Sequence, residues 1–296
     1  MENWTLLALD NGEGSQELGD FFKKIWDGRI IRKQLVHGNF FKKDIIASEI
    51  GKATDGLEGR ILTVYGKGNY HHYTYGLCNS IAKKRSDDYA YIHVDRHTDS
   101  GYSKDKLDCA SFTKNLLEEP RAKTLMFIGS DDDTGNNTSN DYALIHQKEL
   151  VSDSKKECVR GELKKIEQKD VYCSFDLDVL EKSDMYTRFL QGKIVLKDLL
   201  QIISVIQDEK RIVSADVLGY CEVCLTFPGW ATREMSLLTY AAVAAKIAGK
   251  DTKELEKLHA YLKEANNSWV SKNLPLYNSP KMMRKEFNRL TSRLRV

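Results

Sequence analysis

The chain has 296 residues, of which 41% are hydrophobic and 30% charged, and it contains only four prolines. This composition is typical of a globular protein and excludes a fibrous or largely disordered chain. The net charge of +2 gives no basis for a nucleic-acid partner. The sequence also lacks the run of about 18 apolar residues that a membrane span needs, so no membrane association is expected.

Short apolar runs of strand length recur along the chain and are separated by stretches of helical periodicity. Strands are predicted at 4–10, 60–66, 89–95, 124–130, 170–179 and 211–219. Helices are predicted within 18–26, 75–84, 196–210, 233–249 and 252–270. Strands that alternate with helices predict an α/β protein with a mainly parallel sheet between two helical layers, a three-layer αβα arrangement.

The length is compatible with one α/β catalytic domain over residues 1–296, and this is the domain organisation we expect. Residues 271–296 are basic and are predicted to form a C-terminal tail or helix that is solvated or contacts another subunit. A homo-oligomer is therefore left open. The N-terminus lacks the basic segment and apolar core of a signal peptide, which predicts a cytoplasmic location.

The six cysteines do not have the spacing of a disulfide framework, so we expect free thiols. Cys221 and Cys224 form a CxxC motif. No second CxxC accompanies this motif, and no histidine lies near it. We therefore interpret the pair as two packed thiols rather than as a zinc or redox site.

Side chains that commonly bind metals follow three of the predicted strands. They are His71 and His72, then Asp95, His97 and Asp99, then Asp176 and Asp178. Alternate residues of an extended chain project from one face, so the three in the second segment are expected to point the same way. The carboxyl ends of parallel strands meet at one edge of a sheet. Buried carboxylates repel one another and lose solvation, and this predicts a cation among them.

The number of ligands separates the candidate metals. Four aspartates with two imidazoles are too many for one tetrahedral zinc. A mixed set of carboxylates and imidazoles suits Mn²⁺, and two ions can share bridging carboxylates. The sequence therefore predicts a centre with two Mn²⁺.

The same segments resemble the three signatures of the arginase/ureohydrolase superfamily. The Gly-Gly-Asp-His signature is matched by GNYHHYTYG, the Asp-Ala-His-x-Asp signature by DRHTD, and the Ser-x-Asp-x-Asp signature by SFDLD. The runs FIGSDD and RIVSADVLGYCEV resemble two further strand ends of that family. The similarity in order and spacing extends over residues 60–250 and implies an arginase/deacetylase-like fold.

Carried over by position, the resemblance implies two ligand sets. One manganese would be held by His71, Asp95, Asp99 and Asp176, and the other by Asp95, His97, Asp176 and Asp178. His72 is an alternative to His71, because two adjacent histidines leave the register open by one residue.

The resemblance also implies the reaction, which is hydrolysis of a guanidino group to urea and a primary amine. Asp99 would carry a proton to the leaving amine, and Glu222 is the candidate for the carboxylate that holds the guanidinium. The local Glu-Val-Asn-Pro pattern of the family is absent around Glu222.

The sequence departs from the family where free arginine would be recognised. Residues 100–115 contain no histidine, although free-arginine enzymes carry a proton-shuttle histidine after the second signature. Thr134 stands where such enzymes have an aspartate that reads the α-amino group. We expect the conversion of arginine to ornithine, and this combination of features resembles a peptide arginase, which acts on arginine within a peptide. Three alternatives stay open: hydrolysis of another guanidino compound such as agmatine, a deacetylase-like amidohydrolase, and a metal-binding protein without activity.

Overall fold

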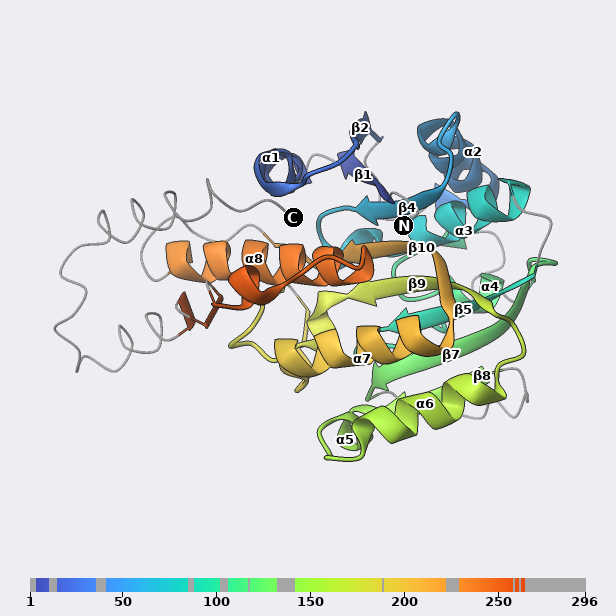
Figure 1. Cartoon of the computed structure of the whole chain (residues 1–296). Coiled ribbons are helices and arrows are strands. Elements are labelled where there is room, and N and C mark those ends of the chain that lie inside the picture. Colours follow the sequence, from blue (N-terminus) through green and yellow to red (C-terminus); the bar gives the residue numbers. More distant parts are fainter. Residues whose placement is uncertain are drawn as a thin grey trace, which may run out of the picture.

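An eight-stranded sheet forms the centre of the computed structural model (Figure 1). The structure describes residues 4–10, 15–35, 41–84, 88–101, 106–116, 118–131, 142–187, 189–221, 229–257, 259–260 and 262–263. The strands are β1 (Trp4–Asp10), β2 (Ile30–Gln34), β4 (Arg60–Val64), β5 (Tyr89–Val94), β7 (Ala122–Ser130), β8 (Tyr142–His146), β9 (Asp170–Asp176) and β10 (Arg211–Leu218). Their order is β2-β1-β4-β10-β9-β5-β7-β8, and every pairing is parallel. A separate antiparallel pair joins β3 (Phe41–Lys42) and β6 (Lys106–Leu107).

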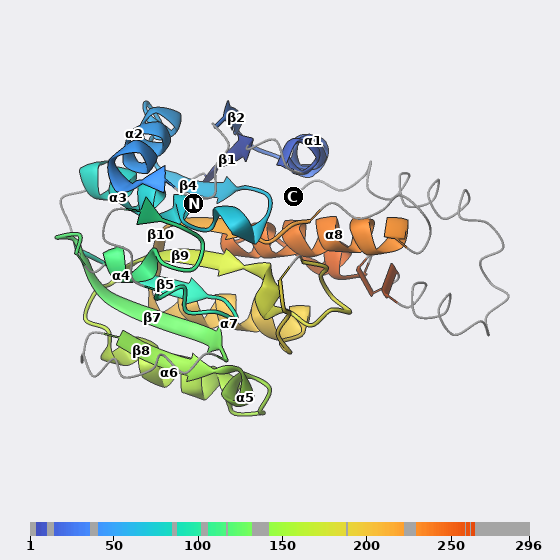
Figure 2. The ribbon, with the colours of Figure 1, turned by 180° about the vertical axis from the view of Figure 1, so that it is seen from behind.

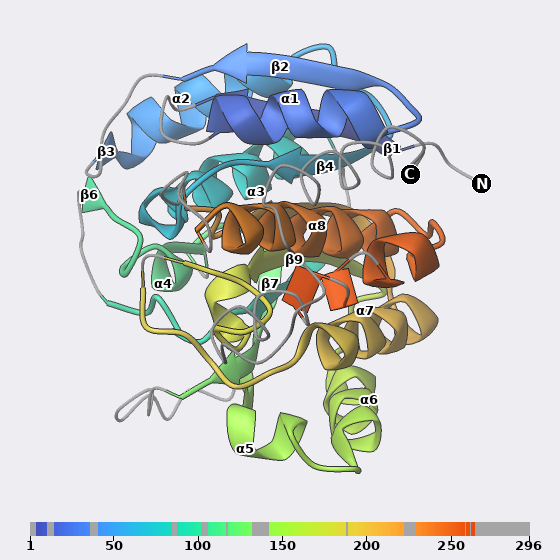
Figure 3. The ribbon, with the colours of Figure 1, turned by 90° about the vertical axis from the view of Figure 1, so that its left-hand side faces the viewer.

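Helices cover both faces of the sheet. They are α1 (Ser15–Ile25), α2 (Lys43–Thr54), α3 (Tyr73–Lys84), α4 (Thr113–Leu116), α5 (Gln147–Leu150), α6 (Lys155–Lys165), α7 (Leu196–Glu209) and α8 (Gly229–Ile247), with short 3-10 turns η1 (Gly68–Tyr70) and η2 (Leu177–Val179). Figure 3 shows α8 lying between α1 and α7 on one face, and in Figure 2 the strands β5 and β7 pass in front of α7.

Two separate apolar clusters correspond to these two faces. Phe22, Leu199 and Leu238, from α1, α7 and α8, belong to one cluster, whereas Ile50 and Leu77, from α2 and α3, belong to the other. Burial on both sides explains why the inner strands read as continuous apolar runs rather than as alternating ones. The predicted three-layer αβα fold with a parallel sheet is confirmed.

All six predicted strands are present, and their bounds agree to within a few residues. The strand predicted at 170–179 ends at Asp176, where the chain turns into η2. The edge strands β2 and β8 were not predicted from the sequence. An edge strand is covered less completely than a central one, and β2 accordingly has partly exposed residues, so its apolar signal is weak.

The predicted helix at 233–249 is confirmed as part of α8. The predicted helix at 252–270 is helical at 253–257, and most of its second half lies outside the described residues, as does the basic segment 271–296. Cys78, Cys109, Cys158 and Cys173 are thiols without a disulfide, whereas Cys224 lies outside the described part of the chain. In the described ranges no helix combines the length and apolar character needed to cross a bilayer.

The path of the chain through the sheet positions the predicted site. After β4 the chain moves on to β5, β7 and β8, and it then returns to insert β9 and β10 between β4 and β5. The carboxyl ends of β4, β10, β9 and β5 are therefore neighbours at the centre of the sheet. Such a change of strand order opens a crevice at the carboxyl edge of a parallel sheet, where ligands bind.

Candidate metal centre

The segment after β5 reaches the crevice by a turn rather than by extended alternation. The strand ends at Val94, and Asp99 has a φ of 49°, in the left-handed region that aspartate tolerates. Thr113 holds this turn, because its hydroxyl and its backbone N–H both donate to the Asp99 carbonyl, at 2.9 and 3.2 Å. Strand alternation was the predicted reason why Asp95, His97 and Asp99 point the same way, but β5 ends before them, and a turn brings them together. The turn brings the Asp99 carboxylate back toward the other ligands.

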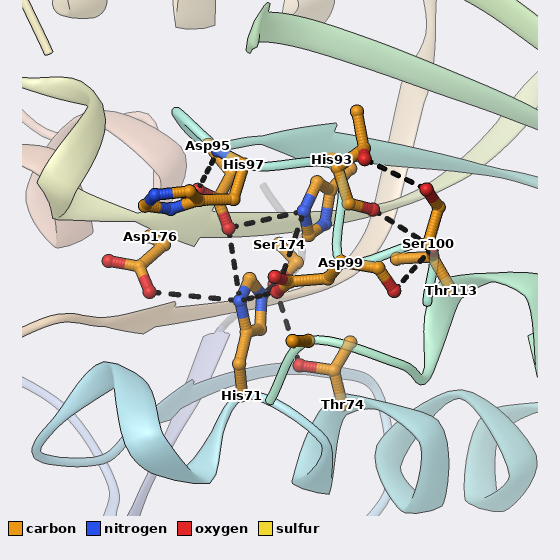
Figure 4. A network of polar contacts seen from close by, with 12 residues as sticks. His71, Thr74, His93, Asp95, His97, Asp99, Ser100, Thr113, Ser174 and Asp176 are labelled. Atoms are coloured by element: carbon orange, nitrogen blue, oxygen red, sulfur yellow. Dashed lines mark hydrogen bonds and ion pairs between the residues drawn. The ribbon is translucent and has the colours of Figure 1, made fainter. Parts of the chain in front are cut away.

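His71 lies between η1 and α3 and points at these carboxylates (Figure 4). Its Nδ1 is 2.9 Å from Asp99 Oδ2, 3.1 Å from Asp95 Oδ2 and 3.7 Å from Asp176 Oδ2. His72, the alternative in the sequence, is buried beside the ring of Tyr73, and burial lowers its pKa to about 4. The structure thus brings His71, and not His72, to the aspartates.

A second group forms around His97. Its Nδ1 is 3.0 Å from Asp178 Oδ2 and 3.5 Å from Asp95 Oδ1. Backbone N–H groups hold these carboxylates in place: His97 N donates to Asp95 Oδ1 at 2.7 Å, and Asp178 N donates to Asp176 Oδ1 at 3.0 Å. All six side chains that the sequence suggested as metal ligands therefore lie together, and Asp95 is shared by the two groups.

His93 also faces this cluster, and sequence reasoning missed it. Its Nε2 is 3.1 Å from Asp95 Oδ2 and 3.9 Å from Asp99 Oδ2, and its ring stacks on that of His71 with centroids 4.8 Å apart. The signal was available, because His93 lies two residues before Asp95 and strand alternation directs both to one face. Strand alternation therefore applies to this pair rather than to Asp99.

The donor atoms fit a metal ion. Two groups have ligand atoms that all lie within 4.8 Å of one another: His71, His93, Asp95 and Asp99 form one, and Asp95, His97 and Asp178 the other. The Nδ1 of His71 and the Nε2 of His93 are buried and face carboxylate oxygens without hydrogen-bond geometry. A cation between them would give each nitrogen a partner. Imidazole and carboxylate donors together suit divalent transition metals.

A buried hydrogen-bond chain orients His71. Ser174 Oγ donates to Asp216 Oδ1 at 2.6 Å, so the His71 Nε2–H, 2.8 Å away, is the donor to Ser174. In this tautomer the unprotonated Nδ1 faces the aspartates. A hydrogen-bond partner on the other ring nitrogen commonly orients metal-binding histidines in this way. Asp216 also accepts from Thr74 Oγ1 at 3.0 Å and from the Tyr172 hydroxyl. Asp216 was not singled out in the sequence, although a carboxylate inside an apolar strand is a signal of such a role.

The cluster concentrates negative charge in a buried place. Burial, followed by repulsion from Asp95, raises the pKa of Asp176 to about 7. Burial also raises the pKa of Asp178 well above its usual value, and Asp176 and Asp95 add to this rise. Contacts with Asp178 and Asp95 raise the pKa of His97 to about 11. Without a metal, bound protons would neutralise part of the negative charge of the carboxylates. The same negative charge would attract divalent cations.

A pocket of about 270 Å³ opens onto the cluster. It is lined by Gly68, Asp95, His97, Thr98, Asp99, Ser100, Gly101, Cys109, Ala110, Asp176, Asp178 and Phe189. The described lining therefore has four carboxylates and no lysine or arginine. Such a pocket favours a cationic group at its inner end. Glu222 and Thr134 lie outside the described residues, so the predicted guanidinium contact of Glu222 stays a prediction.

Gly68 is needed where η1 passes the ligands. A Cβ at this position would lie 2.8 Å from Asp176 Oδ2 and 3.0 Å from the Phe189 ring. We expect Gly68→Ala to displace Asp176 and to reduce metal affinity and activity about 10- to 100-fold, the range seen when groups around a metal site are disturbed. Metal titration and a urea assay measure both effects.

The matched control is Gly161→Ala within α6, where a Cβ meets open space. This control should keep activity and stabilise the fold by about 0.5–1 kcal/mol. Unchanged metal affinity in Gly68→Ala would contradict the prediction.

Comparison with known proteins is consistent with this geometry. A sequence model described as the Arginase family matches residues 40–221, more than half of the chain. The chain belongs to the arginase family. Membership confirms the resemblance found in the sequence and the prediction of a hydrolase that acts on linear amidine C–N bonds. No curated protein matches this arginase-family chain in sequence at a significant level.

Solved structures match the fold of this arginase-family protein. Arginase from Bacillus subtilis has a TM-score of 0.65 at 13% identity, with 84% of this chain and 99% of that chain covered. Proclavaminate amidino hydrolase from Streptomyces clavuligerus has a TM-score of 0.60 at 16% identity, covering 84% and 92%. Arginase from Entamoeba histolytica, solved with L-ornithine, has a TM-score of 0.62 at 14% identity, covering 83% and 97%. At these identities the three structures show a shared fold.

Proposed function

We propose that this arginase-family protein is a binuclear manganese ureohydrolase that converts arginine within a peptide to ornithine, with release of urea. The observation that carries the proposal is the pair of ligand groups that share Asp95 at the floor of an acidic pocket. When bound, two divalent cations supply Lewis acidity that makes a water molecule nucleophilic near neutral pH. His71, Asp95, Asp99 and Asp176 would hold one ion, and Asp95, His97, Asp176 and Asp178 the other.

The side chains around the pocket have separate roles in this proposal. The acidic lining binds the guanidinium and orients its planar carbon toward the floor. Asp99 lines the pocket, and its carboxylate takes the proton lost by the attacking water and delivers it to the leaving amine nitrogen. Phe112 is fully buried behind the ligands, with its ring 4.8 Å from that of His71. It lies in the segment that lacks the family's proton-shuttle histidine, so the proton transfer falls to Asp99.

The residues in and next to the pocket favour a peptide substrate over a free amino acid. A free α-carboxylate would approach four aspartates, with no lysine or arginine among the described lining residues to pair with it. An amide group of a peptide carries no such charge. Phe189 lines the pocket and Leu190 follows it, and they are 38% and 73% exposed. These apolar side chains would contact the residues that flank the arginine.

The function can be tested by urea release. Protein stripped with a chelator and then reconstituted with Mn²⁺ is expected to release urea from an arginine peptide, and the stripped protein is not. A panel containing free arginine, agmatine and guanidinobutyrate addresses the small-guanidine alternative, and an acetyl-lysine peptide addresses the deacetylase-like one. If the reconstituted protein releases urea from none of these guanidino compounds, the ureohydrolase proposal is wrong.

A further inference from the structure

The histidine that sequence reasoning missed extends the ligand set. We infer that His93 is a third imidazole ligand of the metal pair and binds the same ion as His71, Asp95 and Asp99. This inference rests on the metal-dependent function proposed above. The set implied by the family resemblance has one imidazole for this ion, and His93 adds a second.

The spacing of the four donor atoms supports a common ion. Ligands bound at about 2.1 Å lie about 3.0–3.4 Å apart along the edges of an octahedral or tetrahedral site, and about 4.2 Å apart across an octahedron. His93 Nε2 and His71 Nδ1 are each 3.1 Å from Asp95 Oδ2. Asp99 Oδ2 is 2.9 Å from the His71 nitrogen and 3.9 Å from the His93 nitrogen. The three separations of 2.9–3.1 Å are close to the edge length of one coordination polyhedron. The separation of 3.9 Å lies between the edge length and the diagonal of an octahedron.

An ordinary hydrogen bond does not account for His93. Its Nε2 is buried and close to Asp95, yet it lacks the direction of a hydrogen bond to that carboxylate. The parallel stacking of the His71 and His93 rings, with 15° between their planes, points two neighbouring nitrogens at one carboxylate oxygen. Two nitrogens that converge on one oxygen without hydrogen-bond geometry are the arrangement expected of ligands around a cation.

The outer nitrogen of His93 has an oxygen partner, as the outer nitrogens of metal-binding histidines usually do. Its Nδ1 is 2.8 Å from the Tyr91 hydroxyl, and the Tyr91 ring stacks on that of Tyr172 with centroids 6.0 Å apart. Tyr91 is completely buried and therefore cannot move away easily. This contact orients the imidazole of His93 as Ser174 orients that of His71, at 2.8 Å from its outer nitrogen. Each imidazole is thus oriented by a partner of the ring nitrogen that faces away from the aspartates.

A second imidazole changes the chemistry of this ion site. Two nitrogens with the carboxylates of Asp95, Asp99 and Asp176 give it a softer donor set than the other site, which has one nitrogen, from His97, with three aspartates. Imidazole donors favour the later divalent metals over Mn²⁺. We therefore expect the His71–His93 site to bind Co²⁺ more tightly than the His97 site does, so that Co²⁺ enters the two sites in sequence.

The test counts imidazole ligands in the cobalt-substituted protein. Each imidazole bound to Co²⁺ gives one strongly shifted, exchangeable N–H signal in the proton NMR spectrum. Wild-type protein is expected to show three such signals when both sites are filled, from His71, His93 and His97. His93→Gln should show two and should bind its first Co²⁺ at least about 10-fold more weakly. The matched control, His146→Gln, changes a histidine at the end of β8 and should keep all three signals.

The outcomes separate this inference from the proposed function. Two signals in wild-type protein, or three retained in His93→Gln, would overturn the ligand assignment even if urea is released. Three signals without urea release from any guanidino compound would leave the assignment intact and refute the function. Failure of wild-type protein to bind Co²⁺ would overturn both. Circular dichroism checks that the variants are folded, and the wild-type count does not depend on any variant.

Discussion

Asp95→Asn is expected to lower urea release by at least about 1000-fold, equivalent to about 4 kcal/mol of transition-state stabilisation. Asp95 belongs to both groups of donor atoms found among the described residues, and in the proposed function it holds both ions. Contacts with His71, His93 and His97 outweigh the opposing effect of burial and lower its pKa well below the usual value, so its carboxylate is anionic and suited to bridge two cations. A neutral amide is a poor bridge between two cations. Metal analysis and a urea assay, performed on the same preparation, measure the loss.

Asp131→Asn is the matched control for this variant. Asp131 follows β7 at the same edge of the sheet, but it faces Arg96 at 3.7 Å and belongs to neither ligand group. Its substitution should leave metal content and turnover close to those of wild type. If Asp95→Asn retained two ions and normal turnover, the shared carboxylate would not be a bridge and the binuclear proposal would fail.

An arginine in the middle of a peptide is expected to be hydrolysed with a kcat/KM at least about 100-fold higher than that of free arginine. The physical reason is the charge of the free amino acid, whose α-carboxylate would lose solvation beside an acidic pocket without a cationic partner in the described lining. Mass spectrometry detects the loss of one CN₂H₂ unit from the peptide. A preference for free arginine would reverse the proposed substrate class and leave the hydrolytic function in place.

The exposed rim offers a variant that separates the two substrate classes. Leu190→Ser should weaken hydrolysis of peptides with apolar residues next to the arginine, and it should not change that of small guanidino compounds. Val151→Ser is the control, because Val151 is also exposed, at 54%, but is not next to a lining residue of the pocket, whereas Leu190 follows the lining residue Phe189. Equal effects of the two substitutions would mean that the rim does not contact the substrate.

The sequence by itself determined much of the fold and most of the candidate ligands. The central strands are buried on both faces, and continuous apolar runs make such strands visible without any structure. Asp95, His97, Asp99, Asp176 and Asp178 were recognisable because their short spacing at strand ends is a local pattern. A local pattern of this kind can be recognised in the sequence without knowledge of the strand order.

The tertiary structure decided which side chains share an ion. The turn between η1 and α3 decides that His71, rather than His72, faces the aspartates. Asp99 reaches the cluster through a turn in which its own backbone is left-handed, and strand alternation does not predict this. Asp216 became visible as a member of the site only when β9 and β10 were placed side by side, because it accepts hydrogen bonds from Ser174 on β9 and from Thr74 on α3. The stacking of His93 on His71 likewise joins segments that are far apart in the chain. A contact between distant segments depends on strand order, and no single stretch of sequence encodes it.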